Sequence, residues 1–253
     1  MLTAITRSVS PSMNQCELTY LPRVEIDLAR AAGQHRQYEA CLRELGAQVI
    51  SLPPEGDLPD SVFVEDPAVV VDELAVMTRM GVESRRREGD SLADALAPFR
   101  PIRWMRTPAT LEGGDVMRAG RKVFAGTSSR TNPEGIRQLG EALAPFGYQV
   151  RAVEVRGCMH LKTGCSYIGD NTLLANRQWI DPQAFAEFRI LDVAPEEPWA
   201  SNVLRIGHTL LMPAAYPATA ARLESAGWKV RTVDVSELMK AEAGVTCMSL
   251  LFV

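Results

Sequence analysis

The chain has 253 residues, of which 46% are hydrophobic and 23% charged, and its formal net charge is -4. This composition is typical of a folded protein with a large core, and it excludes intrinsic disorder. A weakly acidic chain lacks the basic face that nucleic-acid binding requires, so we expect no nucleic-acid partner. No apolar run approaches the roughly 20 residues that cross a bilayer, so we expect no membrane span.

The cysteines and the first residues bear on the compartment. Five cysteines occur without a Cys-x-x-Cys pair, which predicts neither a disulfide framework nor a structural zinc site. The first 20 residues lack the charged start and apolar middle of a signal peptide. We therefore expect a cytoplasmic protein with reduced thiols.

One pattern, two short strands around a tight turn, recurs along the chain. It starts at five positions, namely Asp66, Asp115, Cys165, Asn202 and Cys247. The last copy takes its hairpin partner from a strand at residues 2–7. The starts are 37 to 50 residues apart, a spacing that is typical of a repeat array or a propeller. Gly169-Asp170-Asn171 is one example of the turn chemistry that favours these hairpins.

Amphipathic helical segments lie between the hairpins. We expect these helices at residues 27–45, 83–96, 132–146 and 216–226, and strands after helices at 49–52, 149–153 and 229–233. Asn132 before Pro133 predicts a helix cap, and Gly147 predicts the helix end. The unit is therefore about ββαβ, repeated five times around a centre, which predicts an α/β fold of the five-bladed propeller type. One domain would cover residues 1–253. The alternative is an unrelated run of hairpins in an irregular α/β domain.

Closure of such a ring would bring equivalent strand starts together at one axial channel. Asp66, Glu112, His160 and Cys247 all lie at or near those starts. A cysteine nucleophile usually needs a base and an orienting acid, so Cys247, His160 and Glu112 form a candidate catalytic set. The other two histidines lie in a polar helical segment and in a hairpin turn, which favours His160. A packed thiol and a hydrogen-bonded core histidine are the structural alternatives.

Six motifs occur in order along the chain, at residues 59–67, 83–86, 112–115, 129–132, 160–164 and 245–249. Together they resemble the dimethylarginine dimethylaminohydrolases, from about Leu18 to Cys247. The resemblance implies the pentein fold, a five-bladed α/β propeller, in agreement with the repeats. It also implies hydrolysis of asymmetric dimethylarginine and monomethylarginine to citrulline and an alkylamine, without a metal or an organic cofactor.

A guanidinium is a planar cation with a weakly electrophilic carbon. Attack on it needs carboxylates that orient it, a thiolate, and an acid for the departing amine; carboxylate pairing with a guanidinium is directional and charge-assisted. The resemblance implies that Asp66 and Glu112 hold the guanidinium while Cys247 attacks it to form a thiouronium intermediate. His160 resembles the family's general acid and base, and Glu65 matches a pocket position beside Asp66.

The ends of the substrate need separate anchors. Arg85 and Arg130 match the family's arginines that bind the α-carboxylate, whereas Asp60 and the backbone carbonyl of Leu18 match its α-amino contacts. A solvated helix start is the alternative for Arg85, and a surface position near a helix cap is the alternative for Arg130. The chain departs from the family at Ala243, in an approach to the nucleophile that is often glycine-rich.

Three other functions stay open on the sequence. A related pentein enzyme, such as an arginine deiminase or an amidinotransferase, would act on another guanidine. The compact chain favours hydrolysis of dimethylarginine over these activities. A non-catalytic guanidine-binding protein would need no nucleophile. A metal-binding protein could use Cys247 and His160, but two ligands leave a structural zinc site incomplete. The sequence leaves a homodimer open.

Overall fold

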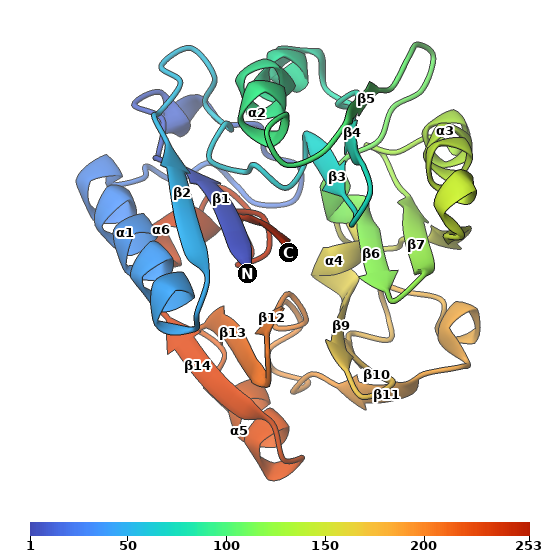
Figure 1. The fold of residues 1–253 in the computed structure, drawn as a ribbon. Helices are drawn as coiled ribbons and strands as arrows, with labels where there is room; N and C mark the ends of the chain where they lie inside the picture. Colours follow the sequence, from blue (N-terminus) through green and yellow to red (C-terminus); the bar gives the residue numbers. More distant parts are fainter.

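The computed structural model describes residues 1–253 and arranges them as five three-stranded sheets around a common centre (Figure 1). The blades are β15-β1-β2, β3-β4-β5, β6-β7-β8, β9-β10-β11 and β12-β13-β14. In every blade the inner and middle strands are antiparallel, and the outer strand runs parallel to the middle strand. The expected five-bladed α/β propeller of ββαβ units is confirmed.

The strand bounds follow the order of the blades. The strands are β15 (Leu250–Phe252), β1 (Thr3–Arg7), β2 (Gln48–Leu52), β3 (Ala68–Val70), β4 (Ala75–Met77), β5 (Ile102–Trp104), β6 (Val116–Ala119), β7 (Lys122–Thr127), β8 (Gln149–Glu154), β9 (Cys165–Gly169), β10 (Thr172–Ala175), β11 (Arg189–Asp192), β12 (Leu204–Ile206), β13 (Thr209–Pro213) and β14 (Lys229–Val233). The first and last strands share one blade, because β1 pairs with β15, and the two termini lie side by side near the centre (Figure 1).

In four of the blades an α-helix connects the middle strand to the outer strand on the outside of the ring (Figure 1). The two shortest α-helices precede inner strands instead. The α-helices are α1 (Leu28–Glu44), α2 (Gly89–Leu96), α3 (Pro133–Leu143), α4 (Leu161–Gly164), α5 (Pro217–Ser225) and α6 (Ser236–Met239). The 3-10 helices are η1 (Met13–Gln15), η2 (Glu83–Glu88), η3 (Gly113–Asp115), η4 (Ala144–Phe146) and η5 (Pro182–Phe185). The blade of β9, β10 and β11 uses η5 in place of an α-helix, which explains why its repeat is the shortest.

Local chemistry accounts for the helix ends. The side chain of Asn132 accepts a hydrogen bond from the backbone N–H of Gly135, at 2.8 Å, and so caps α3. Gly147 ends η4 with a φ of 77°, a conformation that glycine adopts without strain. The expected helix at residues 83–96 is two elements, η2 followed by α2. The outer strands β5 and β11 were not expected, and no residue of either strand is buried.

The interior consists of five hydrophobic clusters, the largest with 19 buried residues. The helices α3 and α5 pack against β8 and β14, the outer strands of their own blades, whereas α1 also contacts β14 of the neighbouring blade. This packing leaves the loops before the inner strands free to meet at the axis. None of the helices combines the length and apolar character that a membrane span would need.

Candidate active site

Polar side chains precede all five inner strands at one end of the axis. Asp66 precedes β3, Glu112 precedes β6, His160 precedes β9, Asn202 precedes β12 and Cys247 precedes β15. A cavity of about 20 Å³, here called the front cavity, lies among these loops. It is lined by Glu17, Asp60, Phe63, Asp66, Arg85, Arg130, Met159, His160, Ala241, Glu242, Ala243 and Cys247. The structure thus brings the expected nucleophile and base to one cavity.

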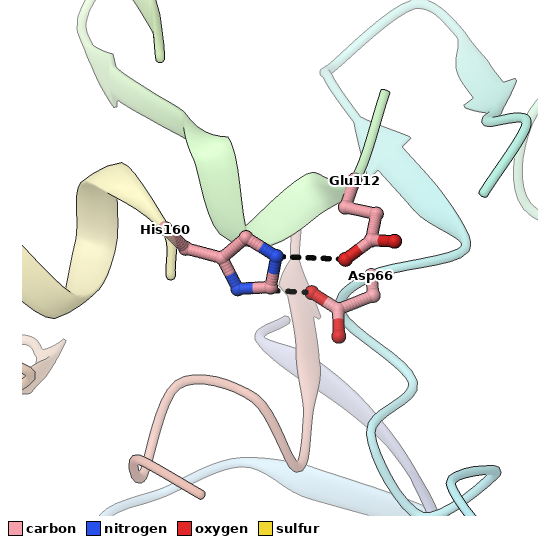
Figure 2. A group of neighbouring side chains, drawn as sticks. All are labelled: Asp66, Glu112 and His160. Atoms are coloured by element: carbon pink, nitrogen blue, oxygen red, sulfur yellow. Dashed lines mark hydrogen bonds and ion pairs between the residues drawn. The ribbon is translucent and has the colours of Figure 1, made fainter. Parts of the chain in front are cut away.

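His160 faces two carboxylates from neighbouring blades (Figure 2). Its Nε2 lies 2.7 Å from Oε2 of Glu112, and its Nδ1 lies 3.9 Å from Oδ1 of Asp66. All three side chains are buried, and Glu112 has no exposed surface. Glu112 therefore stands behind the imidazole rather than on the cavity wall, a position suited to orienting the ring.

His160 and Glu112 stabilise each other's charged forms. Burial alone would lower the pKa of His160, but the charge of Asp66 and the hydrogen bond to Glu112 outweigh it and raise the pKa to about 9. Burial alone would raise the pKa of Glu112, but its hydrogen bond to His160 lowers that pKa to about 2. At neutral pH the pair is therefore an imidazolium and a carboxylate, and His160 holds a proton that it can donate.

Glycine is required where these side chains approach the backbone. A Cβ atom on Gly114 would lie 2.5 Å from Nδ1 of His160 and 2.9 Å from Oδ1 of Asp66. The backbone N–H of Gly114 instead donates to Oδ1 of Asp66, at 3.1 Å. The Gly113-Gly114 pair thus lets the Glu112 loop pass close to the imidazole and fixes the Asp66 carboxylate.

Asp115 is a buried residue that the sequence analysis placed in a motif but gave no role. Its Oδ1 accepts from the backbone N–H of Leu161, at 2.9 Å, next to His160. Its Oδ2 accepts from the hydroxyls of Ser128 and Thr131, at 2.6 and 2.7 Å. Asp115 therefore anchors the loop that carries the imidazole. Its position at the start of an inner strand was the signal that could have identified it.

Cys247 lies partly exposed on the cavity wall, in a turn where the Gly244 N–H donates to its sulfur at 3.4 Å. Burial, together with the negative charges of Glu65 and Asp66, raises the pKa of the Cys247 thiol to about 12. The thiol is therefore neutral at pH 7 when no ligand is bound. This agrees with the effect expected of carboxylates beside a thiol.

Glu65 does not line the front cavity. Its backbone N–H donates to the carbonyl of Cys247, at 3.1 Å, and its carboxylate pairs with Lys162 and accepts from the Thr246 hydroxyl at 2.8 Å. Asn202 supports the same turn, because its Oδ1 accepts from the backbone N–H of Thr246 at 3.0 Å. Glu65, Lys162 and Asn202 thus form a platform beneath the cysteine. Sequence reasoning missed the parts played by Lys162 and Asn202.

Arg85 is buried and almost fully engaged by the protein. Its Nε and Nη2 both donate to the Glu88 carboxylate at 2.9 Å, and its Nη1 donates to Oδ2 of Asp66 at 3.1 Å. Burial would lower the pKa of Arg85, but the charges of Glu88 and Asp66 outweigh it and hold the pKa above its usual value. The guanidinium can therefore offer little to a substrate carboxylate unless its bond to Asp66 is exchanged.

Arg130 is less engaged than Arg85. Its Nη2 donates to Oγ1 of Thr19 at 3.0 Å, while its buried Nη1 has no hydrogen-bond partner and lies 3.5 Å from Oε1 of Glu112. Asp60 lines the cavity and accepts from the backbone N–H of Glu17 at 3.1 Å. Leu18, the next residue, is half-buried and does not line the cavity. Arg130 and Asp60 thus present polar groups to the site more directly than Leu18 does.

One group of side chains has the spacing of a metal site. The ligand atoms of Asp66, Glu112 and His160 lie within 4.8 Å of one another. Arg85 lies 3.1 Å from Asp66 and 3.9 Å from Glu112, so a metal cation would stand next to a guanidinium. Repulsion between these positive charges opposes metal binding at the three ligands. Of the Cys247–His160 metal pair considered from the sequence, His160 belongs to this group and Cys247 does not.

Comparisons with known proteins agree with this geometry. Residues 54–202 match the arginine deiminase family model, which places the chain in that class of guanidine enzymes. The chain is 38% identical over 228 residues to N(G),N(G)-dimethylarginine dimethylaminohydrolase of Pseudomonas aeruginosa, covering 89% of this chain and 90% of the relative. It is also 38% identical over 248 residues to the Streptomyces coelicolor protein of the same name, covering 97% and 95%. The chain belongs to the dimethylarginine dimethylaminohydrolase family.

Solved structures give the same result. The fold matches a Pseudomonas aeruginosa dimethylarginine dimethylaminohydrolase, in a cysteine-to-serine mutant complexed with citrulline, with a TM-score of 0.94, 36% identity and full coverage of both chains. A histidine-to-glycine form of a dimethylarginine dimethylaminohydrolase, as an adduct with S-methyl-L-thiocitrulline, matches with a TM-score of 0.94, 35% identity and full coverage of both chains. A cyanobacterial arginine dihydrolase domain matches with a TM-score of 0.87 at 18% identity, which shows a shared fold alone.

Proposed function

We propose that this protein hydrolyses N-omega-methylated arginines to citrulline, with release of dimethylamine or methylamine. The observation that carries the proposal is the buried His160–Glu112 pair, with Asp66 beside it, at the cavity that Cys247 also lines. This arrangement supplies a nucleophile, an acid and carboxylates around one small site. Two family members that are 38% identical to this chain carry the name of that activity.

The first half of the reaction forms a covalent intermediate. A bound guanidinium brings positive charge beside Cys247 and lowers the pKa of the thiol, which releases its proton to solvent because His160 is already protonated. The thiolate attacks the guanidinium carbon and forms a C–S bond, while His160 donates its proton to the departing alkylamine. Collapse then breaks the C–N bond and leaves a thiouronium on Cys247. Asp66 orients the guanidinium, and Glu112 keeps the imidazole in place.

The second half consumes water. Once His160 has lost its proton, the imidazole is neutral and can act as a general base. It takes a proton from a water molecule, whose oxygen attacks the thiouronium carbon. The C–S bond breaks, citrulline forms, and Cys247 returns as the thiolate or, with a proton, as the thiol. The steps balance with water alone, so we propose that no metal or organic cofactor takes part.

The ends of the substrate would meet different groups. Arg130 has a buried Nη1 without a hydrogen-bond partner, which suits it to the α-carboxylate. Asp60 and the carbonyl of Leu18 are proposed for the α-ammonium, whereas Arg85 would contribute by exchanging its bond to Asp66. Glu65 is proposed to act from beneath Cys247, through its contact with the nucleophile turn.

The structure also bears on the domain organisation and the location of the enzyme. We propose that residues 1–253 form one catalytic domain, because β1 and β15 join the two chain ends in one blade. All five cysteines are unpaired, which supports a cytoplasmic location. A homodimer stays a prediction, to be tested by sedimentation of the purified protein.

The decisive assay offers the purified protein dimethylarginine, monomethylarginine, arginine and agmatine separately. Citrulline should form from the two methylated arginines, and the released amine should be dimethylamine and methylamine respectively. A Cys247→Ser variant is the matched control for non-enzymatic release. Turnover of free arginine alone would contradict the proposal and favour an arginine deiminase.

A further inference from the structure

Residues 17–24, here called the lid, connect η1 to α1 beside the front cavity, and no backbone–backbone hydrogen bond holds them. Side chains from other loops hold them instead. The backbone N–H of Glu17 donates to Asp60, Thr19 accepts from Arg130, and the Tyr20 hydroxyl donates to the carbonyl of Cys158 at 3.0 Å. The lid therefore touches loops from several blades around the axis.

Glu242 makes more hydrogen bonds to the lid than any of these side chains. Its Oε1 accepts from three consecutive backbone N–H groups, those of Thr19, Tyr20 and Leu21, at 3.0, 2.5 and 2.7 Å. Hydrogen bonds to a carboxylate are stronger than neutral ones. Its Oε2 is buried and has no partner, and its backbone has a φ of 59°, which is unusual for a residue other than glycine. The three hydrogen bonds stabilise the closed lid, whereas the unpaired oxygen and the unusual φ of Glu242 destabilise it. Such a balance suits a contact that opens and closes.

The front cavity is too small for the proposed substrate. The cavity offers about 20 Å³ to the centre of a water-sized sphere, and about 10 to 15 Å³ on this measure is enough for one water molecule, so it holds little more than one. An arginine derivative does not fit in this space, which Glu17 of the lid and Glu242 both line. We infer that the three bonds to Glu242 open to admit a substrate and re-form behind it.

A bound substrate would change the other contacts of the lid. A substrate carboxylate on Arg130 competes with Thr19 Oγ1 for the same guanidinium. The bonds to Glu242 compete with no proposed substrate group, because they use the backbone N–H groups of the lid. Once the substrate is in place, the three hydrogen bonds to Glu242 become the main contact between the lid and the loop that carries Cys247.

We propose that Glu242 is a positioning residue, which closes the lid over bound substrate and thereby sets the Leu18 carbonyl against the substrate α-ammonium. The three captured N–H groups follow Leu18 directly in the chain, so their position determines where that carbonyl lies. Glu242 would therefore control selection for the α-amino group without touching it. This inference rests on the proposed function.

The first test measures the lid itself, without any substrate. Amide hydrogen exchange at Thr19, Tyr20 and Leu21 should be protected in the wild type and at least about tenfold faster in Glu242→Ala, the effect expected from losing charge-assisted bonds. Glu242→Gln keeps an uncharged acceptor and should lie between the two. Tyr20→Phe is the matched control, because it removes a lid contact to Cys158 and leaves Glu242 intact. Equal exchange in the wild type and Glu242→Ala would overturn the proposal.

The second test separates positioning from chemistry. Glu242→Ala should raise KM for dimethylarginine about tenfold, and kcat should change less than KM. For a dimethylarginine analogue in which hydrogen replaces the α-amino group, KM should change much less. Glu242→Gln should partly restore the difference. An unchanged ratio of the two KM values, despite faster lid exchange, would overturn the positioning role. If the wild type releases no alkylamine from dimethylarginine, the proposed function fails. The exchange test would still show whether Glu242 holds the lid.

Discussion

The two ends of the propeller axis differ in size and in chemistry. The front cavity, at the start of the inner strands, is about 20 Å³ and is lined by charged side chains. The opposite end holds a cavity of about 420 Å³, here called the rear cavity, where 15 of the 24 lining residues are hydrophobic. The pair of Glu65 and Lys162 lines the rear cavity and lies beneath Cys247, so it divides the two.

The larger of the two cavities is therefore not the one at which we propose the reaction. The largest pocket is usually the first candidate for a ligand site. Here the inner strands line the large cavity, whereas the loops before those strands carry the proposed nucleophile, the imidazole and the carboxylates. Loops on a rigid scaffold are where reactive groups concentrate. The predictions below test whether the chemistry belongs to the front end alone.

The largest expected effect is loss of turnover at the front end. Cys247→Ser should fold yet lose turnover, because a serine hydroxyl is a far weaker nucleophile than a thiolate. His160→Gly should trap protein as a substrate adduct, visible by intact mass spectrometry, if hydrolysis of the intermediate is impaired more than attack. Tyr167→Phe, on the rear cavity, is the matched control and should leave turnover close to that of the wild type.

Full activity in Cys247→Ser or His160→Gly would remove that residue from the mechanism. Comparable loss of turnover in Tyr167→Phe, with normal folding, would remove the distinction between the two ends.

The two arginines of the front cavity should respond differently to removal. Arg130→Ala should raise KM for dimethylarginine about ten- to a hundredfold, because one charged hydrogen bond is worth about 1.5 to 3 kcal/mol. Arg85→Ala leaves the buried carboxylates of Glu88 and Asp66 without their partner, so it should also lower the free energy of unfolding by about 3 to 5 kcal/mol. Steady-state kinetics and urea unfolding measure both effects. Unchanged KM in both variants would mean that the carboxylate anchor lies elsewhere.

The contrast between these arginines also shows how far the sequence could predict the site. Period and turn chemistry identified the inner strands, and hence the starts that bring Asp66, Glu112 and His160 together. The engagement of Arg85 with Glu88 was hidden, because it depends on a 3-10 turn where a continuous helix was expected. The support that Asp115 gives to Leu161 was hidden too, because side-chain direction follows from packing between blades. The assigned roles of the site residues stay predictions.

A smaller effect concerns the protonation of the nucleophile. With the pKa of Cys247 raised to about 12 by burial and by Glu65 and Asp66, the free protein should show almost no Cys247 thiolate at pH 7. A non-reactive guanidinium or amidinium ligand should lower that pKa, because its charge offsets the carboxylates. Thiolate absorbance against pH, with and without ligand, measures the shift, and Cys247→Ser subtracts the other four cysteines. An ionised thiol in the free protein would instead favour a preformed thiolate–imidazolium pair.

The smallest effect is a change of stability with pH that depends on His160 and Glu112. The pKa of His160 is raised from its ordinary 6.5 to about 9, so its contribution to stability is complete below pH 6.5 and is lost as the pH rises through 9. A shift of this size is worth about 3 kcal/mol at most. Glu112 has its pKa lowered from 4.5 to about 2, so its contribution is present above pH 4.5 and lost toward pH 2.

Glu112→Gln should lower the pKa of His160 and move the alkaline loss of stability to lower pH, because a neutral amide no longer favours the imidazolium. Urea unfolding at several pH values measures the loss, and nuclear magnetic resonance can follow the ring protons of the three histidines. The rear cavity contains no histidine, so the same titration with Tyr167→Phe should match the wild type. A His160 that titrates at or below pH 6.5 in the wild type would contradict the charge arrangement at the front end, and with it the proton that this residue is proposed to donate.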